Sequence, residues 1–122
     1  MIKKILLVKA PTTVYETNRL TLKSGISEEV PIPLGLCYLA AVIRDAGFES
    51  EIFDPHLDVY DSYRDTRDPE LIKARIRERL SEGGYDLIGV SSQFIYAYKW
   101  GHLICEFAKE VDPSIPVVIG GG

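Results

Sequence analysis

Small polar residues follow three apolar runs of the sequence and form the candidate binding site. The set is made of hydroxyl, amide, proline and glycine positions: Pro11, Thr12 and Thr13, then Ser91, Ser92 and Gln93, and finally Gly120, Gly121 and Gly122. Because glycine has no side chain to keep a ligand away from the backbone, such a set can accept a large, flat or phosphate-bearing ligand at close range. None of these residues is a nucleophile with a base beside it, so we assign binding to them and assign no catalytic residue.

Three common phosphate and cofactor sites do not fit this set. A phosphoacceptor domain needs acidic residues after its first and third strands, where this sequence has Lys9 and Ser92. A dinucleotide site needs GxGxxG between the first strand and its helix, but the loop there carries only Gly25 before Gly35. A P-loop motif is absent. The same loop contains threonines, as a flavin phosphate loop does, but it lacks the glycine of such a loop. This absence disfavours a stand-alone electron carrier.

The histidines and cysteines do not form a recognisable metal site. His56 is predicted to be an exposed loop residue, with metal or cofactor ligation as the less favoured alternative, and His102 is predicted to lie on the surface. Two separated histidines do not make a zinc site, so we assign no metal ligand. Cys37 and Cys105 are predicted to be buried, reduced thiols, and Trp100 a core residue.

The elements that must position the candidate residues alternate between strand and helix. Continuous apolar runs predict strands at 5–8, 51–54, 86–91 and 115–119, and helices are predicted at 34–46, 69–82 and 97–111, with a polar loop at 55–67. This alternation requires parallel pairing through right-handed crossovers. We expect a three-layer, doubly wound α/β sheet of the flavodoxin-like kind with strand order 2-1-3-4. Ligands bind outside the carboxyl ends of such strands, near the point where strand order reverses.

Two features predict that the domain is incomplete within residues 1–122. A flavodoxin-like sheet has a fifth strand and a further helix, so the fourth strand is expected to be an edge. The first helix is apolar on nearly all sides for three turns, which requires cover from its own sheet and from something else. We therefore expect a fragment that ends after its fourth strand and that can self-associate.

Composition limits the classes of function. The 122 residues suit one domain, and 14 Lys and Arg against 18 Asp and Glu give a net charge of −4. This balance lacks the basic excess that a nucleic-acid-binding protein needs. No signal peptide and no run of ~20 apolar residues is present, so we expect a cytoplasmic protein without a membrane span.

Several segments together resemble one family. They are ILLV at 5–8, PIPLGLCYLAAVIRDAGF at 31–48, IFD at 52–54, DLIGVSS at 86–92 and PVVIGGG at 116–122. This combination resembles the N-terminal cobalamin-binding domain of cobalamin-dependent radical S-adenosylmethionine enzymes, a group of Fe-S oxidoreductases. The resemblance covers nearly the whole chain, with Ile32 in place of a usual proline.

The resemblance implies that a corrinoid binds at the carboxyl rim. The candidate residues above would pack against its nucleotide tail and form hydrogen bonds with it. It also implies a partner, a radical S-adenosylmethionine barrel whose CxxxCxxC motif carries a 4Fe-4S cluster; with two cysteines, this chain does not itself carry that motif. Better-known corrinoid proteins have DxHxxG after the first strand. This sequence has Lys9-Ala10-Pro11-Thr12-Thr13 there, so we expect no histidine below the cobalt.

Two functional hypotheses remain open beside the disfavoured electron carrier. The leading one is the corrinoid-binding part of a radical enzyme that performs methyl transfer or a rearrangement. The alternative is a non-enzymatic binding or interface module that keeps the fold without the corrinoid.

Overall fold

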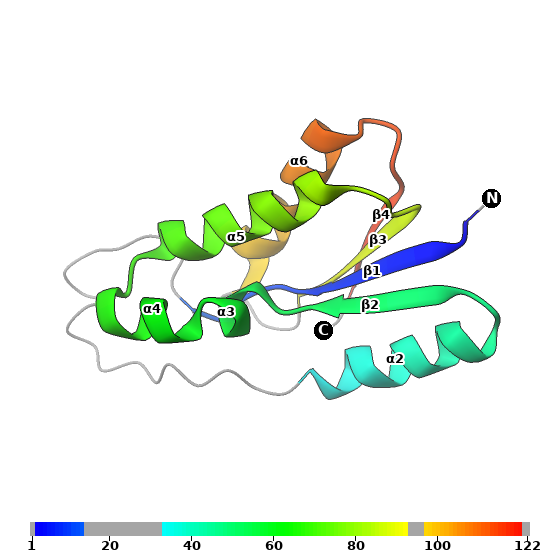
Figure 1. Ribbon diagram of the computed structural model, residues 1–122, viewed down its shortest axis with the longest axis horizontal. Coiled ribbons are helices and arrows are strands. Elements are labelled where there is room, and N and C mark those ends of the chain that lie inside the picture. Colours follow the sequence, from blue (N-terminus) through cyan, green and yellow to red (C-terminus); the bar gives the residue numbers. More distant parts are fainter. Residues whose placement is uncertain (1, 14–32, 93–96, 121–122) are drawn as a thin grey trace.

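The computed structural model describes residues 2–13, 33–92 and 97–120 (Figure 1). The strands are β1 (Lys4–Lys9), β2 (Glu49–Phe53), β3 (Leu87–Ser91) and β4 (Val117–Gly120). The helices are α2 (Leu34–Asp45), α3 (Pro55–Asp58), α4 (Tyr60–Thr66), α5 (Pro69–Glu82) and α6 (Tyr98–Val111). None of the helices in these ranges is long and apolar enough to cross a bilayer.

The four strands form one parallel sheet in the order β2-β1-β3-β4, which confirms the predicted topology. In the register of the sheet, Val8 of β1 lies opposite Phe53 of β2 and Val90 of β3, and Val90 lies opposite Ile119 of β4. The strands therefore end near one line, and the residues that follow them share one rim. The order reverses between β1 and β3, so this pair is the switch point at which ligands of such sheets bind.

The two faces of the sheet are covered unequally. Figure 1 shows α5 and α6 on one side of the sheet and α2 on the other. On the α5 and α6 side, strand residues such as Leu6 and Ile88 join a large core with Trp100. On the α2 side, a smaller cluster joins Ile5 and Leu7 to α2, which packs chiefly on β2 and β1.

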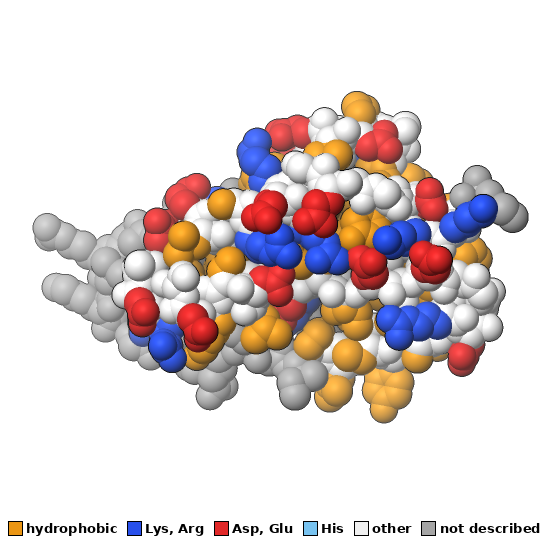
Figure 2. Space-filling view, in the orientation of Figure 1, with side chains coloured by type: hydrophobic (Ala, Val, Ile, Leu, Met, Phe, Trp, Pro, Cys, Tyr) orange, Lys and Arg blue, Asp and Glu red, His pale blue; other side chains and the backbone are white. Residues whose placement is uncertain are grey.

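The outer surface of α2 is apolar and exposed, as its all-round apolar sequence predicts. Leu34, Tyr38 and Val42 are 63%, 76% and 64% exposed. Figure 2 shows hydrophobic side chains gathered along the edge where α2 lies, whereas acidic and basic side chains alternate over α5. The edge strand β4 adds Val118 and Ile119, which are also more than half exposed.

The ends of α5 follow the sequence signals. Asp68 caps its amino end through a hydrogen bond from Glu70 N to Asp68 Oδ1 (3.0 Å), and Pro69 occupies the first position, where no N–H is needed. Gly83 ends the helix with φ at 69° and ψ at −160°, a conformation that L side chains rarely adopt. The helix buries the expected stripe of Ile72, Ile76 and Leu80.

Three predictions about local structure are wrong. Residues 55–67 form α3 and α4 rather than a polar loop, since Asp54 accepts a hydrogen bond from Leu57 N (3.2 Å) and caps α3. Cys37 is exposed, because α2 buries only Leu36 and Ala40 against the sheet, and Cys105 of α6 is half-buried. The third is the predicted exposure of His56, which is buried.

A polar cluster holds the opposite, amino end of the sheet together. Both oxygens of Glu51 are engaged: Oε2 accepts hydrogen bonds from Tyr85 Oη (2.6 Å) and Arg79 Nη2 (2.7 Å), and Oε1 lies 3.2 Å from Lys4 Nζ. These contacts connect β2, β1, α5 and the segment that leads into β3. The hydrogen bond from Tyr85, with the positive charges of Lys4 and Arg79, lowers the pKa of the Glu51 carboxyl.

Candidate functional site

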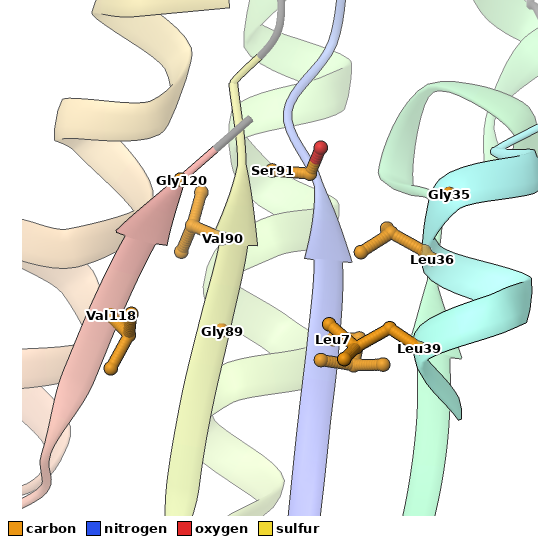
Figure 3. A pocket seen from close by; sticks show the side chains of 9 residues that line it. All are labelled: Leu7, Gly35, Leu36, Leu39, Gly89, Val90, Ser91, Val118 and Gly120. Atoms are coloured by element: carbon orange, nitrogen blue, oxygen red, sulfur yellow. The ribbon is translucent and has the colours of Figure 1, made fainter. Parts of the chain in front are cut away.

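A pocket of about 290 Å³ opens on the α2 side of the sheet, beside β3 and β4 (Figure 3). Helix α2 contributes Gly35, Leu36 and Leu39 to its wall. The strands contribute the remaining described lining residues, which are Leu7, Gly89, Val90, Ser91, Val118 and Gly120. Figure 3 shows Leu7, Leu36 and Leu39 meeting between β1 and α2, with the Ser91 hydroxyl toward the carboxyl end of the sheet.

Glycine creates part of this space. Gly89 lies opposite Leu7 in the register, and a Cβ atom on Gly89 would stand 3.1 Å from Leu7 Cδ2. A Cβ on Gly120 would meet no atom within 4 Å, so the backbone there lies open on that side. Alternation along β3 directs Ile88 and Val90 into the core with α5 and α6, which leaves Gly89 and Ser91 for the α2 side.

A row of four positions crosses the rim of the sheet at this pocket. Ser91 lies opposite Lys9 on one side and Gly120 on the other, and Asp54 follows the paired residue Phe53 by one position. Lys9 Nζ lies 3.4 Å from Asp54 Oδ2, and their side chains are only 10% and 8% exposed. The row therefore runs from a buried ion pair at the ends of β2 and β1 to Ser91 and Gly120, and only the last two line the pocket.

The structure divides the predicted site residues between two faces. Ser91 and Gly120 line the pocket. Ser92 lies toward α6, since a Cβ on Gly101 would be 3.4 Å from its Cβ and Oγ, and its backbone N–H donates to Gly120 O (2.9 Å). Alternation explains the split, because successive strand residues point to opposite faces.

The predicted residues after β1 lie beside the pocket rather than in its described lining. Pro11 and Thr13 are buried and Thr12 is half-buried. Thr13 Oγ1 lies 2.6 Å from Tyr63 Oη. The backbone carbonyl oxygen of Thr13 accepts a hydrogen bond from Trp100 Nε1 (2.9 Å). These contacts fix the end of the β1 segment to α4 and α6. The other predicted residues, Gln93, Gly121 and Gly122, lie outside the described residues.

His56 is buried, with 1% of its surface exposed, which contradicts the predicted loop position. The short helix α3 turns its side chain inward, where the ring stands edge-on against Tyr63 with centroids 5.1 Å apart. Burial lowers the pKa of His56; the Asp54 charge opposes this shift and the Lys9 charge adds to it. His102, by contrast, is exposed and lies 2.9 Å from Glu106, as predicted for a surface residue.

Sequence reasoning missed the apolar wall of the pocket. Leu7, Leu36 and Leu39 are ordinary apolar residues of a strand and a helix, and their types alone do not place them around a cavity. Gly89 offered a signal, since a glycine inside a strand often marks a close approach of a ligand or of another backbone.

Comparison with known proteins identifies the family of this chain. Residues 27–122 match a family model described as the B12 binding domain. The match spans α2 to β4 and so includes every described lining residue of the pocket except Leu7. Searches of the curated proteins and of the solved structures found no match. Since the family model covers well over half of the sequence, this chain belongs to the B12-binding domain family.

Proposed function

We propose that this chain binds a corrinoid and holds its nucleotide tail in the pocket between α2, β1, β3 and β4. The observation that carries the proposal is the position of this apolar pocket, which opens at the switch point of the sheet beside Ser91 and Gly120. The family match supports the class of ligand. The geometry supports the place where the ligand lies.

The pocket suits part of a corrinoid rather than the whole molecule. Its volume of about 290 Å³ lies just below the range for small-molecule sites, roughly 300–1,000 Å³. A flat heterocyclic base fits such a space, and leucine and valine side chains with a bare Gly89 form a surface on which it packs. The corrin ring then stays outside at the rim, where Gly120 leaves the backbone open to close approach.

The chain's own residues bind and orient the ligand. Leu36 and Leu39 exclude water from the base, and the Ser91 hydroxyl donates or accepts a hydrogen bond at the mouth of the pocket. When bound, a corrinoid supplies a cobalt ion that carries an alkyl group. We assign no catalytic residue to the chain.

We further propose that no histidine binds the lower face of the cobalt. The segment after β1 reads Ala10-Pro11-Thr12-Thr13, and Thr13 is already engaged with Tyr63. His56 packs against Tyr63, whose ring belongs to the core on the α5 and α6 side. Electron paramagnetic resonance of the cobalt(II) form tests this assignment, since hyperfine splitting from an axial nitrogen that disappears in His56→Gln would contradict it.

The chemistry that we propose for the complete system is methyl transfer or a rearrangement, performed with a radical S-adenosylmethionine barrel that carries the 4Fe-4S cluster. The segment at 31–48, which resembles that family, supports this context. The exposed apolar side of α2, with Tyr38 and Val42, offers a surface for the barrel.

The direct test is to mix the purified chain with hydroxocobalamin and separate it by size exclusion. We expect corrin absorbance in the protein peak. Gly89→Leu, which places a side chain in the pocket, should remove that absorbance, while its circular dichroism spectrum remains that of a folded chain. Ala74→Leu, on the exposed side of α5, adds the same side chain elsewhere and should bind like the parent. A colourless parent peak would overturn the proposal.

A second candidate function, an interface module without corrinoid, is favoured by one observation. Exposed apolar side chains lie on α2 and on the edge strand beside it, namely Leu34, Tyr38, Val42 and Val118. Exposed apolar surface and an unpaired strand edge both promote association. We expect the chain to self-associate at high concentration, and light scattering that reports a monomer would count against this surface as an interface between copies.

A further inference from the structure

The sheet has two edge strands, β2 and β4, and they differ in what covers them (Figure 1). On β2, Ser50 faces outward, because the neighbouring Glu49 donates its backbone N–H to Lys3 O on the β1 side (2.8 Å). The Ser50 carbonyl oxygen accepts a hydrogen bond from Arg44 Nη2 (3.1 Å), and the Ser50 hydroxyl donates to Ala40 O (3.3 Å). Helix α2 therefore covers this edge and engages its outward carbonyl group, which protects the strand from pairing.

The β4 edge has no such cover in the described part of the chain. Gly120 O accepts a hydrogen bond from Ser92 N just beyond β3 (2.9 Å), and Pro116 O accepts one from β3 itself (3.1 Å). The even-numbered residues of β4 therefore turn their backbone groups toward β3. Val117 and Ile119 turn their N–H and C=O groups outward, where no described strand pairs with them.

The side chains of the β4 edge are apolar and exposed. Val118 lines the pocket on the α2 side and is 58% exposed. Ile119, whose Cδ1 would lie 3.1 Å from a Cβ on Gly101 of α6, is 51% exposed. Charged residues and prolines usually protect such an edge, and the sequence of β4, VVIG, contains neither. The strand thus offers both hydrogen-bonding groups and apolar surface to a second strand.

A second copy of this chain fits the edge by symmetry. In an antiparallel pair, residues that exchange both N–H···O bonds alternate with residues that exchange none. When Val118 lies opposite the partner subunit's Val118, Val117 of each copy lies opposite Ile119 of the other. Both outward residues then exchange both of their hydrogen bonds. A pair centred on Val117 or on Ile119 would leave the other outward residue beyond the end of β4.

The size of the edge predicts the strength of this association. Strand β4 has only 4 residues, so the paired area is smaller than the roughly 1,200–2,000 Å² of a stable interface. The dimer should therefore be weak and should depend on protein concentration.

We propose that two copies of this chain pair antiparallel through β4, with their Val118 residues opposite each other at a two-fold axis, and so form one continuous sheet. The partner subunit's Val118 then lies beside the Val118 that lines the pocket, on the β4 side of that pocket. This inference deepens the second candidate function, because it names the segment through which copies meet, and it does not depend on a corrinoid.

Charge exchange at Val118 tests the register. Val118→Lys alone and Val118→Glu alone each place like charges opposite each other, so both should weaken the dimer in sedimentation equilibrium. An equal mixture places lysine opposite glutamate and should dimerise about 3- to 30-fold more tightly than either variant alone. Val42→Lys and Val42→Glu, at an exposed position of α2, are the matched controls and should dimerise like the parent, alone or mixed. A parent that stays monomeric up to about 1 mM, or a mixture of the Val118 variants no tighter than its components, overturns the inference.

A disulfide tests the same register by distance. Residues opposite each other in a pair that exchanges no hydrogen bonds have Cα atoms about 4.5 Å apart, within the range of disulfides. With Cys37 and Cys105 replaced by serine, Val118→Cys should form a covalent dimer when oxidised glutathione is the oxidant. Ile119→Cys lies two positions out of register with its own copy and should remain monomeric under the same conditions. Equal cross-linking of the two variants overturns the inference.

Proline tests the backbone bonds. Ile119→Pro removes an outward N–H and no hydrogen bond to β3, a position that tolerates proline in an edge strand. We expect its dimer dissociation constant to rise about 10- to 100-fold, whereas Ile119→Val keeps the N–H and should stay close to the parent. An unchanged dissociation constant in a folded Ile119→Pro overturns the inference. If this variant does not fold, the exchange at the exposed Val118 decides.

The inference and the proposed functions fail in different ways. Dimers that persist in the Val118 variants but weaken in the Val42 variants would place the interface on α2. That result refutes pairing through β4 and leaves the second candidate function intact. A monomeric parent that binds cobalamin refutes the inference and leaves the leading function intact.

Discussion

Gly89 of β3 and Leu7 of β1 lie opposite each other across the sheet, so that a methyl group on Gly89 would stand 3.1 Å from Leu7 Cδ2. This separation is tighter than ordinary van der Waals contact, and the missing side chain opens the pocket beside it. The same two residues thus belong to the sheet core and to the candidate site.

Replacement of Gly89 by alanine should therefore separate stability from binding. Alanine in a strand is favoured over glycine by about 0.5–1 kcal/mol, which offsets only part of the strain of the close contact, often about 1–3 kcal/mol for an overpacked core. We expect the free energy of unfolding in urea to fall by no more than about 2 kcal/mol, while cobalamin binds about tenfold more weakly.

Gly101 of α6 offers a matched control for this substitution. A Cβ atom there would stand 3.1 Å from Ile119 Cδ1, a contact as close as that at Gly89 but on the side of the sheet that faces α6. Gly101→Ala should leave cobalamin affinity unchanged. Equal effects of the two substitutions on affinity would show that the pocket is not the binding site.

His56 should make the stability of the fold depend on pH. Burial holds its pKa below the ordinary value of 6.5, so the unfolded chain binds a proton that the folded chain resists. The free energy of unfolding should fall as the pH drops through about 6.5 and should continue to fall until the folded-state pKa is reached.

Denaturant melts between pH 8 and pH 5 measure this loss. His56→Gln has no proton to take up in that range, so its melts should show a smaller slope. His102→Gln removes the exposed histidine and should keep the slope of the parent. A parent whose stability does not change between pH 8 and pH 5 would contradict the burial of His56 in its neutral form.

The fold was largely predictable because most of its strands and helices are marked by clear patterns of apolar residues in the sequence. Continuous apolar runs marked the strands, a long apolar segment before Gly47 marked α2, and apolar residues at spacings of three and four marked α5 and α6. The short helices α3 and α4 escaped because elements of four and seven residues contain too few turns for a period to show. The cap at Asp54 and the proline after it were the local signals.

The candidate site was predictable only in part. Ser91 and Gly120 were found because residues that end parallel strands meet at one rim. Ser92 was included with Ser91, although adjacent strand residues face opposite sides. The burial of Lys9, Asp54 and His56 together could not be predicted, since it depends on α3, which sequence reasoning took for a loop.

Glu51 should stabilise the amino end of the sheet most at neutral pH. Its pKa lies below the ordinary 4.5 because Tyr85, Lys4 and Arg79 favour the charged form. The contribution is therefore present above pH 4.5 and is lost as the pH falls through the folded-state pKa. The Glu51 side chain is 38% exposed, so solvent screening reduces the size of the effect.

Glu51→Gln should accordingly unfold at lower urea concentration than the parent at pH 7, and the two midpoints should converge toward pH 3. Glu110→Gln removes an exposed carboxylate that lies 3.9 Å from Arg77 and serves as the control, with little change at either pH. A gap between parent and Glu51→Gln that stays constant down to pH 3 would mean that packing, not charge, accounts for the difference.

The hydrogen bond between Thr13 and Tyr63 should be measurable as a coupling energy. The two hydroxyl oxygens are 2.6 Å apart and buried, and the bond fixes the segment after β1 on α4. Tyr63→Phe leaves the Thr13 hydroxyl without this partner, which costs about 1–3 kcal/mol, whereas loss of both hydroxyls is less unfavourable than the sum of the single losses. A double-mutant cycle of Thr13→Val and Tyr63→Phe should therefore give a coupling of about 1 kcal/mol in urea melts.

The same hydrogen bond positions Pro11 and Thr12 beside the rim, so both single variants should also weaken cobalamin binding by a few-fold. Additive effects on stability together with unchanged binding would show that this segment is separate from the site.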